Sequence, residues 1–218
     1  MRLKIFIPLK RLAPFLIFSS IVLAQSPAKL EQSIPTKQTI LNRIGGDNGF
    51  KMSFEQQSQY PFLKTPKISK GSLLYSPKRN FVWEIYGEQA GKVISNGKKT
   101  WIYTPAEEKE DKATLIIKKG NYDGVESVIF DTDYDISSLK TTSNGLKELK
   151  INGSRQKGYE WAVLRFKEEP TLEIDSFEFK DLNGTNTVIK VKTFTRLTKA
   201  VPVGTFNFKA PKGTRIIK

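Results

Sequence analysis

The stretch KGSLLYSPKRNFVWEIYGEQAGKVISNGKKTWIYTP, residues 70–105, decides the fold because it predicts four consecutive antiparallel strands. Side chains alternate between the two faces of a strand, so Phe81, Trp83 and Ile85 share one face of the second predicted strand. The dipeptide Asn96-Gly97 predicts a two-residue type I′ turn, which needs a positive φ at both positions. The stretch therefore indicates two neighbouring hairpins.

The fourth predicted strand repeats the pattern, with Trp101 and Tyr103 on one face and Ile102 on the other. We expect the two hairpins to bring Phe81 and both tryptophans into one region of the sheet. Such an apolar face must be covered by core, by a partner or by a ligand. A packed core is the simplest of these interpretations.

The rest of the chain predicts more strands, with few helices between them. Apolar and polar residues alternate over the ranges 50–60, 159–167, 171–180, 187–195 and 205–209. Ile40, Leu41 and Ile44 fall on one face of a short helix that ends at Gly45-Gly46, and residues 125–129 suit one or two helical turns. We predict an α+β fold with about ten strands in one large, curved antiparallel sheet and a few short helices on one side.

The first residues predict a cleavable secretion signal. Four basic residues precede an apolar run from Leu12 to Leu23, which is shorter than the roughly 20 residues of a membrane span. Val22-Leu23-Ala24 suits signal peptidase, and a short membrane anchor is the alternative. We expect residues 1–24 to be the signal and residues 25–218 a single exported domain. The mature net charge becomes +14 − 4 = +10.

The chain contains no cysteine and no histidine. The core therefore holds together without disulfides, and the commonest general base and metal ligand are missing. Asp131, Asp133 and Asp135 alternate as in a calcium loop, but Ile136 and Thr142 stand where that loop needs Gly and Glu. We expect no enzymatic activity, no metal and no cofactor.

Several motifs in fixed order resemble the periplasmic lipoprotein carrier family LolA. They are F-x-Q at Phe54, G-x-L at Gly71, F-x-W at Phe81, V-I-S-N-G-K-x-x-W-x-Y-x-P at residues 93–105 and F-x-F-x-x-P-x-G at residues 206–213. The resemblance implies an unclosed half-barrel whose concave apolar face is lidded by helices. It also implies that the protein accepts lipoproteins from an inner-membrane ABC complex and delivers their acyl chains to an outer-membrane receptor.

The resemblance also implies which residues act. Strand alternation and the family pattern together assign seven residues to acyl-chain binding: Phe54, Leu73, Phe81, Trp83, Ile85, Trp101 and Tyr103. Six residues would form the lid: Ile40, Leu41, Ile44, Val125, Val128 and Ile129. The family has an arginine before the proline of the second strand, where this chain has Ser76 before Pro77. The lid-closing contact is then made by Lys78 or Arg79, or is absent.

The positive net charge of the chain has several interpretations. A basic chain can bind nucleic acid, but an exported protein rarely meets nucleic acid, and the lysines are scattered among acids. Attraction to an anionic membrane surface or to an acidic partner fits an exported protein better. We expect a monomer that binds lipoprotein acyl chains. A lipoprotein-sensing module and a glycolipid-binding module on the same fold are the alternatives.

Overall fold

The computed structural model describes residues 43–44, 46–108, 111–120, 135–168 and 172–217. These residues all belong to one compact unit of the chain, residues 34–218. The expected signal at residues 1–24 lies outside the described residues, as do the lid residues Ile40, Leu41, Val125, Val128 and Ile129.

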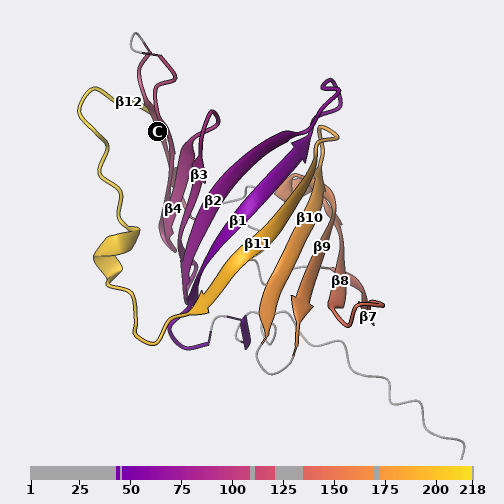
Figure 1. Ribbon diagram of the computed structural model, residues 1–218. Helices are drawn as coiled ribbons and strands as arrows, with labels where there is room; N and C mark the ends of the chain where they lie inside the picture. The colour runs from indigo at the N-terminus through magenta and orange to yellow at the C-terminus, as the bar shows by residue number, and fades with distance from the viewer. Residues whose placement is uncertain (1–42, 45, 109–110, 121–134, 169–171, 218) are drawn as a thin grey trace, which may run out of the picture. The chain divides into compact units, whose positions relative to one another are not determined.

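Twelve strands form one sheet (Figure 1). They are β1 Phe50–Gln59, β2 Lys67–Ser76, β3 Asn80–Tyr86, β4 Gly91–Asn96, β5 Lys99–Thr104, β6 Thr114–Lys119, β7 Ile136–Thr141, β8 Lys147–Ser154, β9 Tyr159–Lys167, β10 Glu173–Asp181, β11 Asn186–Arg196 and β12 Arg215–Ile217. Their order in the sheet is β12-β6-β5-β4-β3-β2-β1-β11-β10-β9-β8-β7. Because β12 and β7 stand at opposite ends of this order, the sheet is not closed.

The expected architecture is confirmed in outline and corrected in detail. The sheet is mixed rather than wholly antiparallel, because β12 pairs with β6 in parallel. The helices among the described residues are a two-residue stretch at 43–44 and the 3-10 helices η2 (Arg155–Lys157) and η3 (Val203–Phe206). The predicted lid of short helices is therefore not supported by the described part of the chain.

The turns also differ from the prediction. Lys78 and Arg79, between β2 and β3, have φ values of 67° and 60°, and they are the described non-glycine residues with positive φ. Asn96 is not among them: its Oδ1 instead accepts hydrogen bonds from the backbone N–H groups of Lys98 and Lys99. The prediction of a type I′ turn at Asn96-Gly97 is therefore wrong, although the hairpin exists. An asparagine side chain that caps a turn removes the need for a positive φ at its own position.

The C-terminal segment follows a path that the alternation of Phe206 and Phe208 did not predict. No strand forms at residues 205–209: Phe206 ends η3 and is 1% exposed. β3 and β4 already have partners on both sides, so they offer no free edge to another strand. The chain instead continues to the free edge of β6, where β12 pairs with β6 in parallel (Figure 1).

Candidate functional site: the apolar face of the sheet

One face of the sheet, from β3 to β8, is lined by buried apolar side chains. We call it the apolar face. Two rows of direct cross-strand partners define it: Trp83–Leu73–Met52–Phe194 over β3, β2, β1 and β11, and Leu149–Leu164–Phe177–Ile189 over β8, β9, β10 and β11. All eight belong to one cluster or pack against it. Direct partners across a ladder point to the same side, so the cluster lies on a single face.

The composition of this cluster is uniform. It consists of aliphatic and aromatic side chains, and its ionisable members are two tyrosines, Tyr75 and Tyr159. Burial raises the pKa of Tyr75, an effect that the positive charge of Arg79 partly opposes. Tyr75 therefore stays neutral at physiological pH. The described apolar face thus offers mainly hydrophobic contact, and Lys147 of β8, the direct partner of Phe166, places a charged side chain on the same face.

Phe54 occupies a place on this face that only a glycine opposite it allows. Phe54 pairs with Gly71 across β1 and β2, and its ring centroid lies 4.5 Å from that of Trp83. A Cβ on Gly71 would stand 2.4 Å from Cζ of Phe54 and 2.6 Å from the carbonyl oxygen of Glu84. The missing side chain lets the phenylalanine ring lie across the strand and reach the indole.

The structure brings five of the seven predicted acyl-binding residues together. Phe54, Leu73, Phe81 and Trp83 are 1–2% exposed members of the cluster, and Ile85 is partly buried and packs against it. Sequence analysis had not assigned the neighbouring aromatic residues to the site. They are Phe50, Tyr75, Tyr159, Phe166, Phe177, Phe179 and Phe194, and their alternation along β1, β2, β9, β10 and β11 was the signal that could have found them.

Trp101 and Tyr103 lie on the opposite face. Val93 pairs with Trp83 on one side and with Ile102 on the other, so Ile102 shares the face of Trp83. Trp101 and Tyr103 alternate with Ile102 and therefore point away. Trp101 belongs to a second cluster, with Ile94 and Leu115, against which Tyr103 packs. The expectation that both tryptophans share one face was wrong because it compared strands without their register.

Tyr103 lies beside a cleft between the sheet and the C-terminal segment. Its ring centroid is 5.1 Å from that of Phe208. The cleft has a volume of about 360 Å³, and Ile85, Tyr86, Tyr103, Phe208 and Pro211 are among its lining residues. The C-terminal segment therefore covers apolar side chains of β5 that would otherwise face solvent.

Of the predicted lid residues, the structure describes Ile44. It is 1% exposed and is a member of the cluster on the apolar face. Its neighbour Arg43 accepts a hydrogen bond at its carbonyl oxygen from Nη2 of Arg196, which also donates to the carbonyl oxygen of Leu172 over 3.1 Å. Ile44 and Leu172 are the described members of the cluster that lie outside the strands.

Lys78 and Arg79 lie in the turn between β2 and β3, next to the turn that follows β4. A Cβ on Gly97 would stand 2.5 Å from the carbonyl oxygen of Lys78, so the two turns touch through their backbones. Holding two non-glycine residues in the left-handed region costs about 1–2 kcal/mol each. The turn is thus strained at the end of the strand that carries Phe81.

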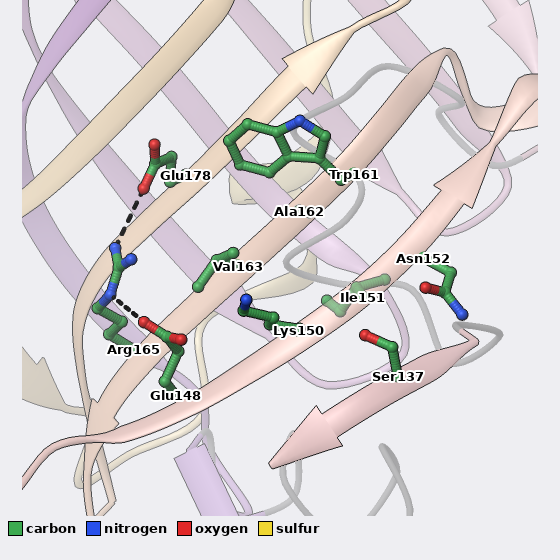
Figure 2. Close-up of a pocket in the computed structure, with 10 residues that line it drawn as sticks. All are labelled: Ser137, Glu148, Lys150, Ile151, Asn152, Trp161, Ala162, Val163, Arg165 and Glu178. Carbon is green, nitrogen blue, oxygen red and sulfur yellow. Dashed lines mark hydrogen bonds and ion pairs between the residues drawn. The ribbon is translucent and has the colours of Figure 1, made fainter. Parts of the chain in front are cut away.

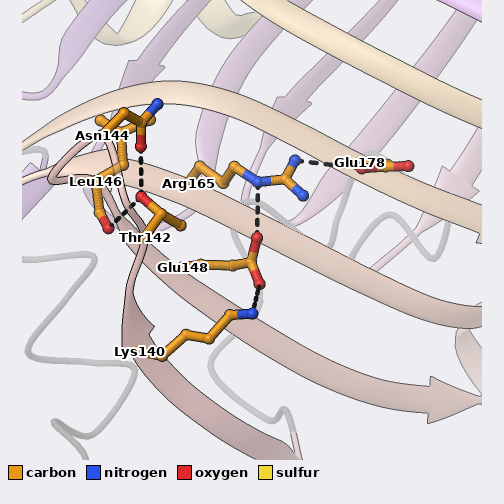
Figure 3. A network of polar contacts seen from close by, with 7 residues as sticks. All are labelled: Lys140, Thr142, Asn144, Leu146, Glu148, Arg165 and Glu178. Atoms are coloured by element: carbon orange, nitrogen blue, oxygen red, sulfur yellow. Dashed lines mark hydrogen bonds and ion pairs between the residues drawn. The ribbon is translucent and has the colours of Figure 1, made fainter.

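The opposite face carries an ion-pair network that the sequence did not indicate (Figure 3). Nε of Arg165 lies 2.9 Å from Oε2 of Glu148, and Nη1 of Arg165 lies 3.2 Å from Oε2 of Glu178. Nζ of Lys140 reaches Oε1 of Glu148 over 3.2 Å. These four side chains come from β7, β8, β9 and β10, one from each strand. The network therefore ties together the four strands at one end of the sheet.

Glu148 stays ionised within this network. Its burial alone would raise its pKa, but hydrogen bonds and positive charge from Lys140 and Arg165 outweigh the burial and lower the pKa. The guanidinium pKa of Arg165 is raised: burial alone would lower it, and the hydrogen bonds and negative charge of Glu148 and Glu178 outweigh that effect. Both carboxylates are thus engaged in ion pairs, which suits a structural role better than proton transfer.

A pocket of about 430 Å³ lies over this network (Figure 2). Its lining includes the indole of Trp161, Val163 and Lys150 beside the paired charges of Glu148 and Arg165. The described lining has no histidine, cysteine or group of metal ligands.

Comparison with known proteins now adds to this geometry. The family model of the outer membrane lipoprotein carrier protein LolA matches residues 46–209. A comparison with curated proteins found no match. No helix among the described residues has both the length and the apolar character that a membrane crossing requires.

Three solved structures are similar to this chain. A LolA superfamily protein from Nitrosomonas europaea is 13% identical, with a TM-score of 0.45 over 80% of this chain and 98% of that chain. A putative outer membrane lipoprotein-sorting protein domain from Vibrio parahaemolyticus is 12% identical, with a TM-score of 0.43 over 78% and 94%. A DUF1329 family protein from Desulfovibrio piger is 11% identical, with a TM-score of 0.44 over 79% and 97%.

Proposed function

The chain belongs to the LolA family of outer membrane lipoprotein carrier proteins, and from this premise we propose that it carries lipoprotein acyl chains across the periplasm. It would accept lipoproteins that an inner-membrane ABC complex releases and would deliver them to the outer membrane. A cleavable signal at residues 1–24 would bring the protein to that compartment. Catalysis is not part of this role.

The observation that carries the proposal is the apolar face. An apolar cluster extends from β3 to β8 and is built from residues such as Phe54, Trp83 and Phe177. Each methylene buried away from water contributes about 0.8 kcal/mol, so one sixteen-carbon chain costs on the order of 12 kcal/mol to expose. A lipid-anchored protein therefore needs an apolar surface of this kind to leave a membrane.

The same composition suits release. Contacts with aromatic and aliphatic side chains are non-directional, and the acyl chain finds equivalent contacts in a bilayer. A charged or strongly hydrogen-bonding pocket would add a specific interaction that transfer has to break. We propose that Phe54, Leu73, Phe81, Trp83 and Ile85 contact acyl chains, and that Ile44 moves away when the chains enter.

The test compares two substitutions in one strand that point to opposite faces. Ile85 packs against the apolar face, whereas Val82 packs against the second cluster, and both are partly buried. The mature protein and its Ile85→Asn and Val82→Asn variants would be titrated with a triacylated lipopeptide, and lipids that co-purify from cells would be identified by mass spectrometry. We expect Ile85→Asn to weaken lipopeptide binding about tenfold, because a polar amide would then face the acyl chain.

The control variant separates binding from folding. Val82→Asn disturbs the opposite face of the same strand and should bind lipopeptide like the wild type. A protein that carries no lipid from cells and binds no lipopeptide would contradict the proposed function. Equal weakening by both variants would contradict the assignment to the apolar face.

A further inference from the structure

Three loops meet at one end of the sheet and form a surface that we call the loop rim: residues 60–66 between β1 and β2, 155–158 between β8 and β9, and 182–185 between β10 and β11. The backbone N–H of Leu182 donates to the carbonyl oxygen of Gly158 over 3.2 Å. A Cβ on Gly184 would stand 3.2 Å from Cγ of Pro61. The β1–β2 and β10–β11 hairpins end side by side (Figure 1). The rim is thus one continuous surface.

The loop rim exposes large apolar side chains. Phe62 is 81% exposed and Leu182 is 46% exposed, and Ile68, just after the first loop, is 67% exposed. Single exposed apolar residues are ordinary, but a group of them at one edge indicates an interaction surface. Phe62 and Leu182 come from the two loops that meet at Pro61 and Gly184, and Ile68 follows in β2.

Internal hydrogen bonds fix the loop that presents Phe62. The backbone N–H of Leu63 donates to the carbonyl oxygen of Tyr60 over 3.1 Å. Nε2 of Gln59 donates to the carbonyl oxygens of Tyr60 and Leu63 over 3.1 and 2.6 Å. The loop backbone is thus closed on itself, and the phenylalanine remains outside. The exposure of Phe62 is therefore a property of the folded loop.

The charge around these side chains is positive. Residues 60–70 contain Lys64, Lys67 and Lys70 and no acidic residue, and Arg155 is exposed in the adjacent loop. Two acids lie nearby: Oδ1 of Asp181 accepts hydrogen bonds from the backbone N–H groups of Asn183 and Thr185, and the exposed Glu160 pairs with Nζ of Lys180 over 2.8 Å. The loop rim thus combines exposed apolar side chains with a basic surround.

We propose that the loop rim docks on an anionic phospholipid surface. Apolar side chains at loop tips enter the boundary between headgroups and acyl chains, while basic side chains around them meet the negative charge of the membrane. The inference rests on the proposed carrier function and deepens it: the protein would bring its cargo to the acceptor membrane through this rim. Docking would place the end of the sheet, and the apolar face behind it, against the bilayer.

Vesicle binding tests the inference directly. The mature protein would be sedimented with vesicles of phosphatidylcholine alone and of phosphatidylcholine with phosphatidylglycerol in a three-to-one ratio. We expect binding to the anionic vesicles that weakens as salt rises from about 0.1 M to about 1 M, because the Debye length falls from about 10 Å to about 3 Å. We expect little binding to the neutral vesicles.

Two variants of the loop rim probe its two components. Replacing both Lys64 and Lys67 with glutamine should weaken partition to anionic vesicles about 30-fold, since each basic residue near the surface contributes about 1 kcal/mol. Phe62→Ser should weaken it about tenfold. These side chains are exposed, so the variants should fold like the wild type.

Matched controls come from other exposed sites. Val203, in η3, is 76% exposed, and Lys98, in the turn before β5, and Lys99, the first residue of β5, are exposed. Val203→Ser and the glutamine replacement of both lysines should leave partition within about twofold of the wild type. An equal loss in these controls would show a general effect of charge or apolarity and would overturn the assignment to the rim.

Lipopeptide binding separates this inference from the proposed function. Rim variants that lose vesicle binding but keep lipopeptide binding support both. A wild-type protein that binds lipopeptide but ignores anionic vesicles overturns the rim proposal alone. Binding to polyglutamate in place of anionic vesicles would also overturn it, because the rim would then fit an acidic protein partner.

Discussion

The contact between Gly71 and Phe54 gives a prediction whose size follows from the structure. Gly71→Ala would place Cβ 2.4 Å from Cζ of Phe54 and 2.6 Å from the carbonyl oxygen of Glu84. The ring must move and lose part of its contact with Trp83, and the carbonyl belongs to the backbone of β3. Overpacking of this kind costs about 1–3 kcal/mol, whereas alanine in a strand gains about 0.5–1 kcal/mol over glycine. We expect a net loss of about 1–2 kcal/mol in the free energy of unfolding.

Urea denaturation followed by tryptophan fluorescence measures this loss, and a thermal melt should show a midpoint lower by about 2–8 °C. Gly91 in β4 is the matched control, because the nearest atom to its added Cβ would be the carbonyl oxygen of Tyr103 at 3.6 Å, an ordinary contact. Gly91→Ala should leave stability unchanged or slightly higher. Equal stability of the two variants would refute the claim that Gly71 makes room for Phe54.

Three further substitutions test other parts of the structure. Lys78→Gly should raise the free energy of unfolding by about 0.5–1 kcal/mol in a urea titration, because glycine adopts the left-handed backbone conformation without strain. A lower free energy of unfolding in this variant would contradict the claim that the turn is strained. Glu148→Gln should lower the free energy of unfolding at neutral pH. The difference in free energy between this variant and the wild type should shrink as pH falls through the lowered pKa of the Glu148 carboxyl. The control Glu55→Gln, in an exposed ion pair, should change the free energy of unfolding by less than about 0.5 kcal/mol. Phe206→Ala should lower the free energy of unfolding by about 3–5 kcal/mol, and Val203→Ala should leave it almost unchanged, as measured in thermal melts. Equal losses in the two variants would disprove the anchoring of the C-terminal segment by Phe206.

The sign of the pH effect follows from the direction of the shift. The pKa of Glu148 is lower in the folded protein than in the unfolded chain, so the folded state favours the ionised form. The stabilisation is fully present above the ordinary carboxyl pKa of about 4.3 and is lost as pH falls through the folded value. The glutamine variant lacks this titration, and its stability should vary less between neutral and acidic pH.

Local pattern predicted the strands well where apolar and polar residues alternate. β1 and β9 match the predicted ranges 50–60 and 159–167 closely, and β10 and β11 overlap the predicted ranges 171–180 and 187–195. Four strands lie outside the predicted ranges: β6, β7, β8 and β12. Their residues, TLIIKK, ISSLKT, KELKINGS and RII, carry weak or very short alternation. Pairing partners that are distant in sequence decide such strands, and β12 depends on the free edge of β6.

In the candidate site, too, the pattern within one strand was predicted correctly and the relation between strands was not. Alternation within β3 correctly placed Phe81, Trp83 and Ile85 on one face. It could not relate that face to β5, because the register between strands depends on the intervening turn. The turn after Asn96 leaves four residues between the partners Ser95 and Thr100, a longer connection than the predicted two-residue turn. Trp101 consequently points away from Trp83.

Burial also changes how the site should be probed. Phe81 and Trp83 are each 2% exposed, so a glutamate at either position would bury a charge as well as remove an acyl contact. Such a variant is expected to unfold, and its loss of function would not distinguish binding from stability. Half-buried positions at the margin of the apolar face are better probes.

Photo-crosslinking from two such positions tests the central claim most directly. A photoreactive amino acid would replace Ile85, which packs against the apolar face, or Val82, which packs against the second cluster on the opposite face, and both are partly buried. The cargo would be a lipoprotein labelled in cells with tritiated palmitate. We predict strong crosslinks to the labelled acyl chains from position 85 and none above background from position 82. Equal crosslinks from both positions, or crosslinks from position 82 alone, would contradict the proposal that the apolar face holds the acyl chains.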